Sequence, residues 1–189
     1  KNLVVVARAG VGVDNIDVEY ATKKGILVVN APESNIVSAA EHTMGLMLSV
    51  VRNIPQAHAA LKESRWEREA WEGVEVSGKT LGILGMGRIG SLVAKRAKAF
   101  DMNVVVYDPH ISSDAIHILG ASSVNLEELA ARADIITIHL PKNKDTLNMI
   151  NSTFMGKMKP SAYIINVSRG GIVNEEDLYD AIVKGKIAG

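Results

Sequence analysis

Three glycines, Gly85, Gly87 and Gly90, follow a short apolar strand and precede a segment patterned as a helix. The spacing G-x-G-x-x-G is common by chance, so its surroundings decide what it means. Apolar residues recur at helical spacing from Ile89 to Phe100, and a second apolar strand then ends at Asp108. This order of strand, turn, helix and strand predicts a βαβ unit that binds a dinucleotide, in preference to a glycine-rich turn without a ligand.

Each part of the glycine run has a different expected role on a dinucleotide. Gly85 permits a tight turn, Gly87 lets the backbone approach the pyrophosphate, and Gly90 lets the helix pack closely on the strand. The helix begins at Arg88 and Ile89, where backbone N–H groups and a partial positive charge favour phosphate. We therefore expect all five residues to contact the cofactor.

The charge of Asp108 favours one nicotinamide dinucleotide over the other. Its carboxylate is placed to accept hydrogen bonds from the adenosine ribose hydroxyls and would repel the 2′-phosphate of NADP. The next three residues, Pro109 to Ile111, include no Arg or Lys to hold that phosphate. The sequence therefore predicts NAD as the cofactor.

Composition argues against several other classes of protein. The 189 residues include 21 basic and 21 acidic side chains without a basic cluster, so neither nucleic acid nor an anionic membrane is an expected partner. There is no cysteine, which excludes a disulfide framework and a thiolate metal site, and no metal is expected. The longest apolar run, Met44 to Val51, is too short to span a bilayer, and the N-terminus shows no signal-peptide pattern. We expect a soluble, cytoplasmic protein.

From residue 80 onward the pattern alternates strands and helices, as in a doubly wound α/β fold with a parallel sheet covered on both faces. The strands are expected at 80–84, 104–107, 135–139 and 163–167, and the helices at 88–100, 114–119, 126–132 and 175–184. An earlier, separate unit has strands at 3–6 and 26–29 around a helix at 17–24, and a long helix follows at 35–51.

The segment 56–79 is expected to contain a helix followed by an extended arm. Trp66 and Trp71 stand there among many charged residues. Two tryptophans in such a segment suggest an interface, and partial packing into the core is an equal alternative.

Several segments together resemble the D-2-hydroxyacid dehydrogenase family. They are Arg8–Asn15, Gly78–Ile83, Gly85–Gly90, Tyr107–Pro109, His139–Pro141 and, most specifically, Ile165–Val173. The resemblance covers essentially the whole chain in order. Within the family, the first loop and the segment from Asn30 to Glu41 look most like the members that act on D-3-phosphoglycerate.

The resemblance implies a Rossmann NAD-binding domain inserted into a flavodoxin-like substrate domain, with the substrate in the cleft between them. Residues 1–31 would be the end of the substrate domain, 32–55 a crossing or hinge helix, and 56–189 the NAD-binding domain. The last helix should lead into another strand, so we expect an internal piece of a longer protein. The family also implies a homodimer formed through the NAD-binding domains, consistent with an interface at the two tryptophans.

The same resemblance implies hydride transfer between NAD and a small D-2-hydroxy or 2-keto acid. It assigns Arg169 to substrate binding and catalysis, and a permanently charged, planar guanidinium suits a carboxylate. A surface Arg that closes a strand is the alternative. Leu140, Val167 and Ser168 would line the nicotinamide-ribose end of the cofactor, although Ser168 might instead only satisfy a backbone group.

The first loop has an expected role in binding the substrate. Gly10, Val11 and Gly12 would offer backbone N–H groups to its carboxylate or to the nicotinamide, and an ordinary tight turn is nearly as good an interpretation.

The acid–base His of the family, and the Glu that orients it, are expected beyond the last residue of this chain. None of the five histidines matches the motif of that catalytic residue; they are His42, His58, His110, His117 and His139. His139 lies at a strand end near the cofactor, where a structural role is favoured over a chemical one.

Two other interpretations stay open. One is a non-enzymatic module that senses NADH, since some relatives are co-repressors that bind peptides. The other is an isolated NAD-binding fragment without turnover. The His and Glu motifs, if they follow Gly189, would separate the enzyme from the sensor.

Overall fold

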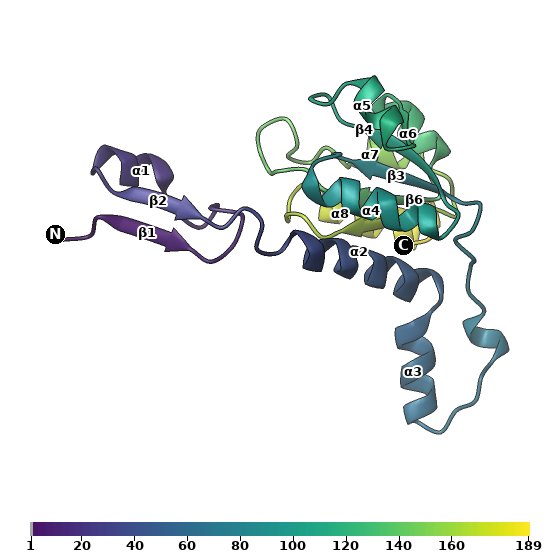
Figure 1. Ribbon diagram of the computed structural model, residues 1–189. Coiled ribbons are helices and arrows are strands. Elements are labelled where there is room, and N and C mark those ends of the chain that lie inside the picture. Colours follow the sequence, from purple (N-terminus) through teal and green to yellow (C-terminus); the bar gives the residue numbers. More distant parts are fainter. Residues whose placement is uncertain (1) are drawn as a thin grey trace. The chain divides into compact units, whose positions relative to one another are not determined.

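The computed structural model describes residues 2–189 and divides into two compact units, one ending at Ala39 and the other formed by Ala40–Gly189 (Figure 1). The first unit is a strand, a helix and a strand. β1 (Val5–Arg8) and β2 (Leu27–Asn30) pair in parallel and are connected by α1 (Val18–Lys23). Because the strands are parallel, the loop that follows β1 and the chain that leaves β2 emerge at the same edge.

The second unit contains a five-stranded parallel sheet in the order β5-β4-β3-β6-β7. Its strands are β3 (Thr80–Leu84), β4 (Asn103–Tyr107), β5 (Ser122–Ser123), β6 (Ile135–Ile138) and β7 (Tyr163–Asn166). The chain adds strands on one side of β3 and then on the other, so the direction of winding reverses between β3 and β6. This confirms the predicted doubly wound Rossmann fold. In such folds, ligands bind outside the carboxyl ends of the strands, where the direction of winding reverses.

Helices cover both faces of this sheet. They are α2 (Ile36–Val51), α4 (Arg88–Ala99), α5 (Ser113–Ile118), α6 (Leu126–Arg132), α7 (Ser152–Met155) and α8 (Glu175–Val183). Leu81 and Ile83 of β3 belong to one hydrophobic cluster with α2, α4 and α5, whereas Leu84 belongs to a second with α6, α7 and α8. Alternate residues of one strand thus support opposite faces, as in a sheet buried on both sides.

Helix α2 belongs to the core of the second unit. Ala40, Met44, Met47 and Val51 recur on one helical face and are buried in the first cluster. The helix predicted at 35–51 is therefore confirmed. The division between the units falls inside this helix, after Ala39, and the assignment of functional domains to residue ranges stays a prediction.

Residues 52–73, here called the arm, belong to this unit and connect α2 with the segment that leads into β3. Asn53 turns the chain with a φ of 52°, and Pro55 lies in the first turn of α3 (Ile54–Lys62). The 3-10 helix η1 (Glu69–Trp71) lies near the end of the arm. The two ends are tied together, because Val74 N–H donates to the Val51 carbonyl at 2.8 Å. Among residues 2–189, no helix is both long and apolar enough to cross a membrane.

Candidate cofactor and substrate site

The carboxyl ends of four neighbouring strands bring most of the predicted site residues to one edge of the sheet. Leu84 at the end of β3 pairs with Tyr107 of β4 and with Ile138 of β6, and Ile138 pairs with Asn166 of β7. The loops after these strands therefore emerge beside one another. They carry Gly85–Gly90, Asp108, Leu140 and Val167–Arg169.

Gly85 occupies a position that only glycine fits. Its φ is +93°, and an added Cβ would lie 2.8 Å from the His139 carbonyl oxygen and 3.0 Å from Leu140 Cδ2. Its N–H donates to the Tyr107 carbonyl at 3.0 Å. Gly85 thus contacts the exits of both neighbouring strands, and Leu140 lies close to it. The predicted contact of Leu140 with the nicotinamide-ribose end of the cofactor stays a prediction.

The other two glycines differ in what surrounds them. An added Cβ at Gly90 would lie 2.1 Å from the Gly85 carbonyl oxygen, so this glycine is required for α4 to approach the turn. At Gly87, an added Cβ would have no described atom within 4 Å apart from those of its two chain neighbours, and φ is an ordinary −67°. The fold itself therefore does not require glycine at position 87. Close approach of a pyrophosphate supplies a reason, and the loop fits a dinucleotide.

The N-terminus of α4 completes the phosphate-binding part of the candidate site. Arg88 and Ile89 form the first turn of this 12-residue helix, and Gly87, at its N-cap, supplies no capping side chain. The helix dipole places partial positive charge at this end, directly after the glycine loop. Arg88 is exposed and Ile89 is half-buried against the first hydrophobic cluster.

Asp108 has a second role that the sequence did not predict. One carboxylate oxygen accepts the N–H of Met86 at 2.8 Å, and the other accepts the N–H of His110 at 2.9 Å. The side chain therefore ties the glycine loop to the turn after β4. Each oxygen retains a further lone pair for a ribose hydroxyl, so the predicted contact with the cofactor is compatible with these bonds.

The backbone of His139, at the exit of β6, contacts the start of the glycine loop: its N–H donates to the Leu84 carbonyl at 2.8 Å. Burial of its ring lowers the pKa of His139 to about 4, and Nε2 lies within hydrogen-bonding distance, 3.0 Å, of Thr137 Oγ1. Such a histidine is neutral at pH 7 and poorly matched to proton transfer at that pH. These properties support a structural role.

The loop after β7 carries Arg169 in a fixed backbone setting. Arg169 Nη1 donates to the Ser168 carbonyl at 2.9 Å, and all three of Val167, Ser168 and Arg169 are half-buried. Val167 also packs against the first hydrophobic cluster. Asn166, which the sequence analysis did not single out, bonds to Ser168 and to the Arg169 backbone. Asn side chains often accept the backbone N–H two residues on, which is the only sequence signal for this residue and a weak one.

The loops after β6 and β7 are tied to each other. Asn148 N–H donates to the Gly171 carbonyl at 2.8 Å, and Ile150 N–H donates to the Ile172 carbonyl at 3.1 Å. The first of these loops is held internally by the buried Thr146, whose hydroxyl donates to the Pro141 carbonyl at 2.7 Å. The segment that carries Arg169 is therefore held on its C-terminal side by hydrogen bonds to the loop after β6.

Gly10, Val11 and Gly12 lie in the first unit, in the loop after β1. The Gly10 carbonyl accepts the N–H of Ala31 at 3.0 Å, and the Val11 carbonyl accepts Asn30 Nδ2 at 2.7 Å. Two of the loop's carbonyl groups are thus fixed to the exit of β2. The predicted contacts of this loop with substrate or nicotinamide stay a prediction.

Curated relatives of known name match this chain over nearly its whole length. It is 49% identical over 188 residues to D-3-phosphoglycerate dehydrogenase of Archaeoglobus fulgidus and 52% identical over 188 residues to that of Methanocaldococcus jannaschii. The alignments cover 100% and 99% of this chain but 36% of each relative. The chain therefore spans about a third of the length of these relatives.

Solved structures and a family model agree with this likeness. Formate dehydrogenase of Granulicella is similar with a TM-score of 0.93 and 31% identity, over 99% of this chain and 51% of that one. D-lactate dehydrogenase of Aquifex aeolicus, complexed with NAD and lactic acid, is similar with a TM-score of 0.89 and 36% identity, over 99% of this chain and 56% of that one. The model described as "D-isomer specific 2-hydroxyacid dehydrogenase, NAD binding domain" matches residues 44–189, in agreement with the predicted cofactor. The chain belongs to the D-isomer specific 2-hydroxyacid dehydrogenase family and includes its NAD-binding domain.

Proposed function

We propose that this chain is the cofactor-binding core of an NAD-dependent oxidoreductase that acts on a D-2-hydroxy acid of the phosphoglycerate type. The observation that carries the proposal is the glycine loop, whose Gly87 has no steric reason within the fold and lies on the same sheet edge as Asp108 and Arg169. NAD, when bound, accepts or returns the hydride.

The cofactor is proposed to lie across the carboxyl ends of β3, β4, β6 and β7. Its pyrophosphate would contact the loop Gly85–Gly90, including the first turn of α4, and its adenosine ribose would bond to Asp108. Leu140, Val167 and Ser168 would border the nicotinamide-ribose end. Hydrogen bonds already hold the loops after these four strands in place, so binding the cofactor in this arrangement requires little further ordering of the protein.

Arg169 is proposed to hold the substrate carboxylate and to polarise the reacting carbonyl or hydroxyl oxygen. A guanidinium stays charged at all physiological pH values and presents several donors in a fixed plane, which suits a carboxylate. Backbone N–H groups of Gly10, Val11 and Gly12 are proposed to bind the same carboxylate or the nicotinamide. The fixed carbonyls of Gly10 and Val11 orient the N–H groups of Val11 and Gly12, which supports this role for those two groups. The N–H of Gly10 already donates to the Arg8 carbonyl at 2.9 Å.

D-3-phosphoglycerate is the proposed substrate. Relatives named for that substrate are 49% and 52% identical to this chain, more than the 31–36% of the formate and D-lactate enzymes described above. A cytoplasmic location is proposed with this activity.

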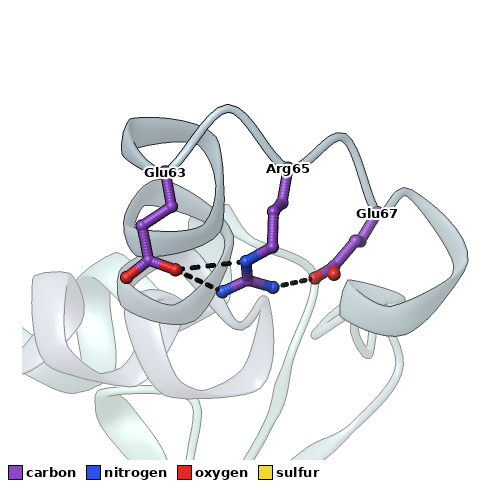
Figure 2. A network of polar contacts seen from close by, with 3 residues as sticks. All are labelled: Glu63, Arg65 and Glu67. Carbon is purple, nitrogen blue, oxygen red and sulfur yellow. Dashed lines mark hydrogen bonds and ion pairs between the residues drawn. The ribbon is translucent and has the colours of Figure 1, made fainter.

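We also propose a homodimer in which the arm contacts a second copy. Trp66 is 75% exposed, and with Ile54 and Leu61 it borders a groove of about 470 Å³. Arg65, next to Trp66, is held between Glu63 and Glu67 by bonds of 2.6–3.1 Å (Figure 2). Such exposed ion pairs add little stability, but they orient the segment on which Trp66 stands. An exposed tryptophan beside apolar neighbours is typical of an interface anchor.

The activity is tested on the full-length protein by following NADH absorbance with NAD and D-3-phosphoglycerate, with D-lactate in a parallel assay. The proposal predicts turnover of order 1–1,000 per second with the phosphorylated substrate and much slower turnover with D-lactate. NADH binding without turnover of either acid would contradict it and would favour a sensor. Faster turnover of D-lactate would overturn the substrate assignment alone.

A further inference from the structure

We infer that Asn166 is a positioning residue for Arg169, and that its side-chain amide sets the direction from which the guanidinium meets a substrate carboxylate. The inference rests on the proposed role of Arg169. Asn166 ends β7, three residues before Arg169, and its side chain is exposed. It was not among the residues expected to contact cofactor or substrate.

The amide of Asn166 holds the backbone on both sides of one peptide bond. Its Oδ1 accepts the N–H of Ser168 at 3.0 Å and the hydroxyl of Ser168 at 2.8 Å. Its Nδ2 donates to the carbonyl of Arg169 at 3.0 Å. The peptide that joins Ser168 to Arg169 lies between these contacts, so one side chain restrains the backbone on both sides of it.

That same peptide anchors the guanidinium. Arg169 Nη1 donates to the Ser168 carbonyl at 2.9 Å. This carbonyl belongs to the peptide whose two neighbouring peptides are bonded to Asn166, and the guanidinium is bonded to the carbonyl. Asn166 therefore acts on Arg169 through two successive hydrogen-bonded steps within four residues.

The downstream side of the loop is held by different groups. Gly171, with a φ of +82°, has its carbonyl bonded to Asn148 N–H at 2.8 Å, and the bridge between Ile150 and Val173 follows. This end of the loop is therefore tied to the preceding loop, and the Ser168–Arg169 peptide lies between it and β7. Asn166 restrains that peptide from the strand side.

Both halves of the amide are required for this arrangement. An aspartate can accept from Ser168 but cannot donate to the Arg169 carbonyl, and an alanine can do neither. Because Asn166 is exposed at the end of a strand, its replacement should leave the buried core unchanged. The effect should therefore be in catalysis and not in folding.

The test uses the full-length protein and the substrate D-3-phosphoglycerate. Asn166→Ala should lower kcat/KM by at least about tenfold, because small misplacements of a substrate-binding group reduce rates strongly. The Kd for NAD should change less than about threefold, and Tm should stay within about 2 °C. Asn125→Ala is the matched control: Asn125 is also exposed and accepts one backbone N–H, from Glu128 at 2.8 Å, at the start of α6. It should keep kcat/KM within about twofold.

A double-mutant cycle separates positioning from a general structural effect. If Asn166 acts through Arg169, Asn166→Ala should reduce kcat/KM by less than about threefold when Arg169 is already Lys, because the coupled group is gone. Multiplicative losses in the double variant would overturn the inference, and so would near-normal kcat/KM in Asn166→Ala. Faster exchange of the Ser168 amide proton in Asn166→Ala checks the hydrogen bond itself, and unchanged exchange would contradict it. An inactive wild-type protein would instead refute the proposed function, and with it the role given to Asn166.

Discussion

The carboxylate of Asp108 accepts a hydrogen bond from the backbone N–H of Met86, with 2.8 Å between Oδ2 and the nitrogen. Asp108 follows β4, whereas Met86 lies inside the glycine loop after β3, so one side chain connects the exits of two neighbouring strands. The residue proposed to bind the ribose therefore also holds the loop proposed to bind the pyrophosphate. A substitution at Asp108 should affect both functions.

Replacing Asp108 with Ala should weaken NAD binding by about 1.5–3 kcal/mol, because a charged acceptor is removed. The preference for NAD over NADP should also narrow, because the repulsion of the 2′-phosphate is lost. Calorimetric titration with both cofactors measures these effects. Asp108→Asn separates them: it removes the charge but keeps one acceptor for Met86, so it should retain more NAD affinity than Ala. Tighter binding of NADP than of NAD by the wild-type protein would contradict the assignment.

Alanine substitutions at Gly87 and Gly90 should have opposite consequences. Gly90→Ala brings a Cβ to within 2.1 Å of the Gly85 carbonyl oxygen and should destabilise the fold by about 1–3 kcal/mol. Gly87→Ala meets open space, so unfolding by urea should change by less than about 0.5 kcal/mol. Its NAD affinity should nevertheless fall at least about tenfold, since the Cβ occupies space proposed for the pyrophosphate. Unchanged NAD binding in Gly87→Ala would refute a ligand-side reason for this glycine.

Protonation of His139 should destabilise the fold as the pH falls. Its pKa is about 4 in the folded chain against an ordinary value of 6.5, so the unfolded chain binds the proton first. Stability should be unaffected above about pH 7, should decrease between about pH 6.5 and 4, and should then level off. The loss from this group has an upper limit of about 3 kcal/mol. Urea unfolding of wild type and His139→Gln at several pH values measures it, and identical pH dependence of the two proteins would show that His139 is not responsible.

Truncation of Trp66 should weaken self-association without weakening the fold. Trp66 is 75% exposed, so Trp66→Ala should change the free energy of unfolding by less than about 0.5 kcal/mol. The dissociation constant of the dimer, measured by sedimentation equilibrium, should rise at least about tenfold if Trp66 is an interface anchor. Ile118→Ala is the control, because Ile118 is 85% exposed in α5, outside the arm. Equal effects of the two substitutions, or a monomeric wild type, would contradict the proposed interface.

The regular elements of the second unit were predictable because their apolar patterns are long enough to read. β3, β4, β6 and β7 lie within one residue of their expected bounds, since each is a buried run between turn residues. Short elements were not predictable. β5 has two residues and α7 has four, which is too few for a periodicity, and β1 begins two residues later than the apolar run at Leu3 suggests.

The helix expected within 56–79 begins earlier, at Ile54. Pro55 lies in its first turn, where the fixed φ and the missing N–H of proline suit the start of a helix. Of the two tryptophans of the arm, Trp71 is half-buried and Trp66 is exposed, and the interface predicted there stays a prediction.

The parts of the candidate site that follow a local sequence motif were predictable, whereas contacts between residues far apart in the sequence were not. The glycine spacing and the strand ending at Asp108 identify a dinucleotide-binding unit from local pattern alone. The bond from Met86 to Asp108 spans 22 positions and depends on the strand order, which the sequence does not contain. Asn166 was missed for a different reason: its partners are near in sequence, but an exposed Asn at a strand end is common and seldom informative.

The most direct measurement of the central claim compares wild type with Arg169→Lys in the full-length protein, using NAD and D-3-phosphoglycerate. Lysine keeps the charge but loses the planar fork, so kcat/KM should fall at least about a hundredfold, equivalent to roughly 3 kcal/mol, with the loss shared between KM and kcat. The Kd for NAD should change little, because Gly85–Gly90 and Asp108 are proposed to hold the cofactor. Near-normal turnover of the Lys variant would contradict the account, and so would a loss of NAD binding large enough to explain the whole decrease.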